Sequence, residues 1–171
     1  SDLTLPTLAS AGWTSLNGVT GANTNSARLV GKIAASSSEA VGTFTSATSV
    51  VVAAYRPKAG YTLSFGAVAA TTGASTTVSY PALTLQTTDG SSWVAGFSGH
   101  RSVNTSLETP PSGMVNRATV LDTTDEAAAH DTNGGVAAWT ARSVSVAGTS
   151  SGWRSATVEI KVNLAVTAKP T

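Results

Sequence analysis

Five ionisable side chains fall within ten positions of the sequence, and they are its strongest candidates for chemistry: Asp122, Asp125, Glu126, His130 and Asp131. Oxygen ligands on a loop can hold calcium, but an EF-hand loop requires ligands at alternate positions and a glycine at the sixth. The spacing here does not match that pattern, and a solvated loop with a helix-capping carboxylate is the favoured interpretation. We therefore predict no metal and no cofactor, with Asp122, Asp125, His130 and Asp131 as weak metal candidates.

The remaining composition offers little support for catalysis. The chain has no cysteine, which excludes thiolate zinc sites and cysteine nucleophiles, and two histidines are too few for the usual histidine-rich metal sites. A glycosidase needs two carboxylates across a cleft, whereas Asp122, Asp125 and Glu126 share one loop. The run 96–100 (GFSGH) has the wrong spacing for a nucleophile elbow, and no helix follows it. We predict that the chain is not an enzyme.

Sugar binding is a more credible chemistry for this sequence. Lectin-like sandwiches present aromatic faces to sugars, flanked by polar donors and acceptors. Trp153 follows a Gly/Ser turn beside Arg154, and sugar binding would require it to be half exposed, but a rim residue that closes the core is the favoured interpretation. The predicted ligand-binding residues are Trp153, Arg154, His100 and Arg101. The other tryptophans are expected in the core (Trp93 and Trp139) or at one end of the sandwich (Trp13).

The elements that would position these residues are strands, because apolar residues alternate with polar ones. In the segment 155–164, the residues from Ala156 to Leu164 with even numbers are apolar and those with odd numbers are polar, which predicts a half-buried antiparallel strand. The segment 48–55 is almost fully apolar, which predicts a strand covered on both faces. Only 125–130 is expected to form a helical turn. Further strands are predicted at 27–34, 41–45, 61–68, 76–85, 93–97, 114–121 and 136–146.

Turn residues separate these segments, notably Asn17-Gly18, Asp89-Gly90 and Asn133-Gly134-Gly135. About nine or ten strands result, the number expected of an all-β, two-sheet antiparallel β-sandwich of jelly-roll type. We expect a single domain over residues 1–171. Similar proline loops at 6–13 (PTLASAGW) and 110–114 (PPSGM) suggest two related halves, 1–70 and 90–166. On that comparison a first strand is missing upstream of residue 1, or another chain supplies it.

Composition also limits the possible partners. The formal net charge is +1 and only 11% of residues are charged, so nucleic acid is not expected as a partner. The longest apolar run, 50–55, is far too short to cross a bilayer, and no membrane insertion is expected. Ser1-Asp2-Leu3 is not a signal peptide, so either export is not secretory or the start has been removed. Short hydroxylated side chains with few charges favour permanent contacts between subunits, and a homo-oligomer is expected.

The order of these elements is a proline-glycine loop, a strand ending near a basic residue, a Ser/Thr/Gly turn and the strand 50–56 (VVVAAYR). It resembles the Ser/Thr/Ala-rich β-sandwich domains of tailed-phage virion proteins, found in minor tail proteins and head-decoration-like proteins. The resemblance covers Leu5 to about Val162, and its motifs are short. It implies a structural or adsorptive role at the surface of an extracellular virion particle, with no catalytic residue to carry over.

The leading hypothesis is therefore a non-enzymatic structural component of a bacteriophage virion. It would be a head-decoration or minor tail protein that attaches to major capsid or tail proteins by burying Ala/Val/Thr surface and pairing strand edges. The alternative is a carbohydrate- or host-receptor-binding β-sandwich module for host attachment, with a host glycan as the partner. A bacterial surface adhesin repeat is the second alternative.

Overall fold

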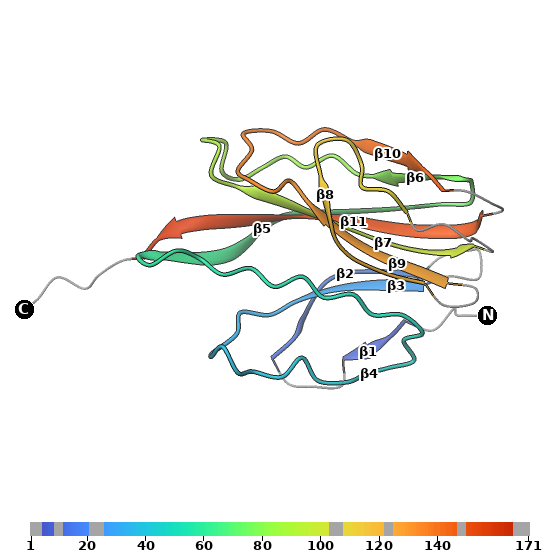
Figure 1. Cartoon of the computed structure of the whole chain (residues 1–171), viewed down its shortest axis with the longest axis horizontal. Coiled ribbons are helices and arrows are strands. Elements are labelled where there is room, and N and C mark those ends of the chain that lie inside the picture. The colour runs from blue at the N-terminus through green and yellow to red at the C-terminus, as the bar shows by residue number, and fades with distance from the viewer. Residues whose placement is uncertain are drawn as a thin grey trace, which may run out of the picture.

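The computed structural model describes residues 5–8, 12–20, 26–102, 108–121, 125–146 and 150–165. Within them the fold is all-β, with eleven strands and no helix, as the alternation predicted. The antiparallel sheets stack in layers as a β-sandwich does (Figure 1), while the jelly-roll connectivity stays a prediction. No described segment forms a helix that is long and apolar enough to span a membrane.

A five-stranded antiparallel sheet forms the middle of the molecule (Figure 1). Its order is β5 (Tyr61–Gly73), β11 (Ser150–Leu164), β7 (Trp93–Ser102), β9 (Asp125–Asp131) and β8 (Val115–Leu121). Along β11, Trp153, Thr157 and Glu159 point to one face, which we call the upper face. Arg154 and Val158 point to the opposite, lower face, because successive side chains of a strand alternate.

Both faces of β11 are buried from residue 152 to residue 160, which corrects the half-exposed strand predicted for 155–164 over most of its length. Thr157 and Glu159 are as inaccessible as Val158, because a layer of chain covers each face of the central sheet. Glu159 is fully buried, and its carboxylate accepts hydrogen bonds from the backbone N–H groups of Ala67 (3.0 Å), Gln86 (2.9 Å) and Thr87 (3.0 Å). The hydroxyl of Ser92 donates a fourth bond at 2.6 Å, so a residue expected in solvent joins four segments.

The upper layer contains β6 (Thr77–Tyr80) paired with β10 (Arg142–Ser145). Two isolated bridges, Leu83 with Trp139 and Ser92 with Val136, continue the layer, so the strand predicted over 136–146 is limited to its second half. The predicted turns at Asp89-Gly90 and Asn133-Gly134 are present. Five buried apolar residues fill the space below: Leu83, Leu85, Val94, Met114 and Trp139.

The lower layer contains β2 (Thr14–Thr20) paired with β3 (Ser26–Gly31), and the short strands β1 (Thr7–Leu8) and β4 (Phe44–Thr45) (Figure 1). The turn predicted at Asn17-Gly18 is wrong, because both residues lie within β2, beside an irregularity in its register with β3. Leu16, Leu29 and Tyr55 pack upward against Val158 and Ile160 of the central sheet.

The helical turn predicted for 125–130 is also wrong, because these residues form most of strand β9. Asp and Glu followed by alanines favour a helix locally, since alanine has the highest helix propensity. In the structure β9 lies between β7 and β8, and Ala127, Ala128 and Ala129 are all buried. Pairing on both edges and burial on both faces therefore outweigh the local preference.

Candidate functional site

The four predicted ligand-binding residues come together at one end of the pair β7–β11, but on opposite faces of the sheet. His100 is paired with Trp153, and both side chains point to the upper face. Arg154 is paired with Gly99 and points to the lower face with Arg101. The predicted set is therefore split by the sheet into two separate environments.

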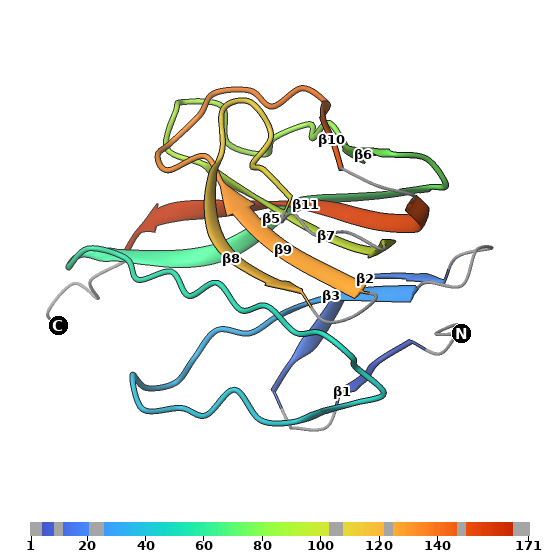
Figure 2. The same ribbon diagram turned by 45° about the vertical axis from the view of Figure 1, so that its right-hand side comes forward.

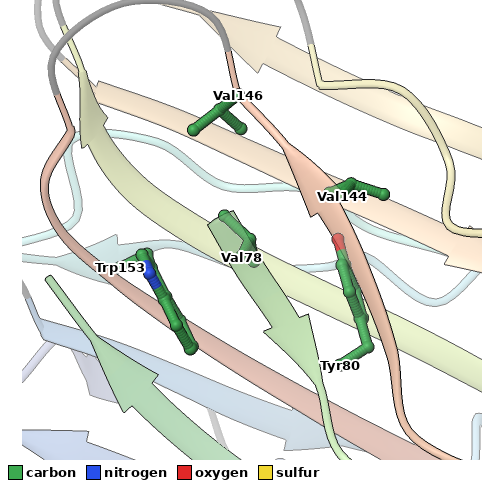
Figure 3. Close-up of a cluster of buried hydrophobic side chains, with 5 residues drawn as sticks. All are labelled: Val78, Tyr80, Val144, Val146 and Trp153. Carbon is green, nitrogen blue, oxygen red and sulfur yellow. The ribbon is translucent and has the colours of Figure 1, made fainter. Parts of the chain in front are cut away.

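Trp153 belongs to the upper core and is only 5% exposed, so it lacks the half exposure that sugar binding requires. Its ring packs with Val78 and Tyr80 of β6, Val144 of β10 and Val146 just after β10 (Figure 3). The favoured expectation, a residue that closes the core, fits this position. A ring face that is packed against other side chains cannot stack on a sugar. The imidazole of His100 is buried as well, so it cannot contribute to a sugar-binding surface.

A group of buried polar side chains lies between the upper face and β6, and we call it the ionic cluster. Its members are Tyr80, Ser98, His100, Glu108, Glu126 and His130. His100, Glu126 and His130 share the upper face because β7 and β9 pair Gly96 with His130 and His100 with Glu126. Glu108 enters from the segment before β8 and lies among them.

The carboxylate of Glu108 is the centre of the ionic cluster. One oxygen, Oε2, lies 3.3 Å from Nε2 of His100 and accepts a 2.9 Å hydrogen bond from the hydroxyl of Ser98. The other oxygen, Oε1, lies 3.3 Å from Nε2 of His130 and accepts a hydrogen bond from the hydroxyl of Tyr80. All four neighbours can donate a hydrogen bond to it, so the charged carboxylate is stabilised by the surrounding protein groups.

Glu126 supports the same arrangement from β9. Its Oε1 accepts a 2.6 Å hydrogen bond from the backbone N–H of Glu108, which fixes the segment that carries that residue. Its Oε2 lies 3.3 Å from Nε2 of His100, so this imidazole lies between two carboxylates. The side chains of His100, Glu108 and Glu126 are completely inaccessible to solvent.

These contacts shift the pKa values in opposite directions. Burial alone would raise the pKa of Glu108, but hydrogen bonds from His100, His130 and Tyr80 outweigh it and lower the pKa to about 2. Burial alone would lower the pKa of His100, but hydrogen bonding and attraction to Glu108 and Glu126 raise it to about 9. Burial, together with the adjacent Glu108, raises the pKa of Tyr80 well above its usual value.

The ionic cluster is built to hold charge and not to exchange protons with a substrate. A general acid or base needs a pKa near the working pH and access to the reacting group. Glu108 and His100 are shifted away from neutrality in the directions that keep both ionised, and their side chains are inaccessible. We therefore interpret the cluster as a structural ion network between β6 and the central sheet.

The weak metal candidates that the structure describes, Asp125, His130 and Asp131, do not come together. Asp125 and Asp131 lie at opposite ends of β9 on the lower face, whereas His130 points to the upper face. Asp131 accepts hydrogen bonds from Nε and Nη2 of Arg117 at 2.7 and 2.8 Å, so its oxygens already have a cationic partner. Asp122 lies outside the described residues. Among the residues that are described, no three His, Asp or Glu side chains form a group that could hold a metal ion.

A second feature lies on the outside of the lower layer, where residues 47–57 run extended beside the central sheet (Figure 2). We call it the extended segment. It pairs with no described strand, which corrects the prediction of a strand covered on both faces. Burial alternates along it: Ser49, Val51 and Tyr55 are partly buried, whereas Val50 and Val52 are 48% and 43% exposed.

Sequence reasoning missed Tyr80, Ser98, Glu108 and the role of Glu126. A signal existed for two members of the cluster, since Glu126 and His130 have the same parity once β9 is interpreted as a strand. No signal pointed to Glu108, because its position depends on a backbone contact with Glu126 that the spacing does not encode. Tyr80 lies within a predicted strand, but its hydrogen-bond partner Glu108 is distant in the sequence, so the local pattern does not reveal the contact.

Comparison with known proteins adds no relative: no family model, no curated protein and no solved structure matches the chain.

Proposed function

We propose that this chain is a non-enzymatic structural component of a bacteriophage virion, a head-decoration or minor tail protein, and that the extended segment is its attachment surface. The occupant of that surface is an extended strand of a neighbouring virion protein. The proposal rests on the observation that residues 47–57 are extended like a strand yet paired with no described strand.

An unpaired extended segment exposes backbone N–H and C=O groups that another chain can pair with. No backbone hydrogen bond joins residues 47–57 to the rest of the described chain. Their inward side chains fix the segment on the lower face, where Tyr55 contacts Trp93 edge to face at 6.2 Å between ring centroids. The segment is thus held in an extended conformation before any partner binds, which lowers the entropic cost of pairing.

The exposed side chains of this region suit a permanent contact. Val50, Val52, Val41 and Ile33 are between 40% and 62% exposed, and all come from the lower layer or the extended segment. Burying apolar surface is favourable by about 25 cal/mol per Å². The resemblance to phage virion domains suggests that the assembly is a virion. Val50 and Val52 would form the surface that contacts the neighbouring virion protein.

The test is incorporation of variants into purified particles that carry this chain. We expect the double variant Val50→Lys, Val52→Lys to fold normally, since both side chains face solvent, and to be lost from particles because two buried cations would oppose docking. The double variant Ala82→Lys, Thr84→Lys is the matched control, because both residues are exposed in the upper layer, on the opposite side of the central sheet from the extended segment. Copy number per particle then separates a decoration protein, with many copies, from a tail-tip protein, with few.

Two outcomes would count against the proposal in different ways. Normal incorporation of the Val50→Lys, Val52→Lys variant would show that attachment uses another surface. Absence of the wild-type chain from purified particles would remove the virion assignment itself.

The carbohydrate-binding alternative loses three of its four proposed residues. Trp153 and His100 are buried under the upper layer, Arg154 is buried on the lower face, and only Arg101 is partly exposed. No observation on the described residues favours a sugar surface over an attachment surface.

A further inference from the structure

A partly open cavity of about 200 Å³ lies on the lower face, lined by the central sheet, β3 and the extended segment. Its walls are mainly apolar and include Leu29, Val51, Phe97, Ala127 and Ala156. Strand alternation explains this lining, since Phe97, Ala127 and Ala156 all point downward from three neighbouring strands.

Three residues that line the cavity carry buried hydrogen-bond donors without partners. Arg154 is 2% exposed, and its Nε and Nη2 have no hydrogen-bond partner. The Nε of Arg28 and the Oγ of Ser49, both from lining residues, are likewise buried and without a partner. Buried polar groups are almost always hydrogen-bonded, so several unpartnered donors around one cavity require an explanation.

Arg154 is held in place by its remaining nitrogen. Its Nη1 donates to the hydroxyl of Thr72 on β5 and, at 2.6 Å, to the carbonyl of Trp153. No carboxylate among the described residues forms an ion pair with it, and burial lowers its pKa from the usual value. Asp125 also lines the cavity, but it is engaged in an interaction of its own. A guanidinium remains charged in proteins, so Arg154 is a buried cation that lacks an anion.

We propose that this cavity binds a small organic carboxylate, whose apolar body fills the space between Leu29, Phe97 and Ala156 and whose carboxylate accepts hydrogen bonds from Arg154. Arg28 and Ser49 offer further donors to the same group. An engineered apolar cavity of about 150 Å³ holds benzene, so about 200 Å³ accommodates a ring with a carboxylate attached. The planar fork of arginine matches a carboxylate in geometry and charge.

Benzoate is the probe, and benzyl alcohol is its uncharged counterpart of similar size. We expect benzoate to shift the NMR signals of Leu29, Phe97 and Ala156 in a saturable way and to raise the melting temperature. Benzyl alcohol should bind at least about tenfold more weakly, because a neutral hydroxyl leaves the charge of Arg154 unpaired.

Two variants assign the binding to this cavity. Arg154→Met keeps much of the side-chain volume and removes the unpaired charge, so the free protein should melt at the same or a higher temperature while benzoate binding falls at least tenfold. Arg142→Met is the matched control, because Arg142 lies over the ring of Trp139 in the upper layer and should leave benzoate binding unchanged. Ala127→Leu fills the cavity and leaves Arg154 in place, and it should also abolish binding.

The proposal is overturned if benzoate gives no saturable response, or if it binds Arg154→Met as tightly as wild type. It is equally overturned if benzyl alcohol binds as well as benzoate, or if the shifted signals lie in the upper layer. Should Arg154→Met fail to fold, Ala127→Leu and the comparison of the two probes on the wild-type chain still decide the question.

Discussion

Glu159 shows how a single charged residue organises the interior of this protein. Its carboxylate is fully buried, yet it accepts bonds from three backbone N–H groups and the Ser92 hydroxyl. Burial alone would raise its pKa, but these bonds, that of Ser92 first, outweigh it and lower the pKa from the usual value. The carboxylate therefore accepts hydrogen bonds from backbone N–H groups of β5 and of the segment 86–92 that pair with no described strand.

We expect Glu159→Gln to lower the free energy of unfolding by about 2–4 kcal/mol, because hydrogen bonds to a charged acceptor contribute about 1.5–3 kcal/mol each and the amide turns a donor toward other donors. Urea denaturation at pH 7 measures the change. Glu39→Gln is the control, since Glu39 lies in the exposed lower layer, paired with Lys32, and its loss should have a much smaller effect. Equal effects of the two substitutions would contradict the role assigned to Glu159.

At the scale of elements, close approach between the lower layer and the central sheet depends on Gly31 at the end of β3. A Cβ atom at this position would overlap the ring of Phe65 and the side chain of Leu16. Gly31 therefore allows β3 to lie directly against β5, and a larger residue would separate the two layers.

We expect Gly31→Ala to destabilise the protein by about 1–3 kcal/mol, the usual cost of an overpacked core. Thermal unfolding measures the effect, and hydrogen exchange in β2 and β3 should increase more than in β6. Gly134→Ala is the matched control, because nothing lies within 4 Å of the Cβ it would add. A Gly31→Ala protein as stable as wild type would show that the layers can shift without cost.

Sequence alternation predicted the strands well where local pattern and pairing agree. The predicted strands at 61–68, 93–97 and 114–121 correspond to β5, β7 and β8. It failed for β9, whose alanines favour a helix locally, and for the extended segment, whose apolar run suggested burial on both faces. In both cases the outcome depends on which chain lies alongside, and a single strand's pattern does not contain that information.

The candidate functional residues were predicted only in part, again because their environment depends on how the strands pack together. His100, Trp153, Arg101 and Arg154 were predicted as one ligand-binding set. They lie at one end of the pair β7–β11, but the two-residue period of the strands divides them between faces. The unpartnered donors of Arg28 and Ser49 come from the lower layer, and only the packing of that layer brings them to the same cavity as Arg154.

For the whole molecule, the ionic cluster makes stability depend on pH in two windows. The pKa of His100 is raised to about 9, so its contribution is complete below about pH 6.5 and is lost as the pH rises through 9. The pKa of Glu108 is lowered to about 2, so its contribution is complete above about pH 4.5 and is lost as the pH falls toward 2.

We therefore expect the free energy of unfolding to decrease by about 1–3 kcal/mol between pH 6.5 and pH 9, because the folded state retains a proton that the unfolded state releases. Urea denaturation at several pH values measures this slope, and it should become flatter in His100→Gln. NMR titration of the His100 imidazole gives an independent reading. An imidazole that titrates near pH 6.5 in the folded protein would contradict the ion network.

The position of β11 in the central sheet also has a consequence for how the protein is made. Strands β5 and β7 do not pair with each other. Each pairs instead with β11, which comes after both of them in the sequence and lies between them in the sheet. In a nascent chain, the strand edges of β5 and β7 that pair with β11 must therefore remain unpaired until residues 150–164 have been synthesised. Such long-range closure is slow, and a chain interrupted before that point would leave adhesive edges exposed to its neighbours.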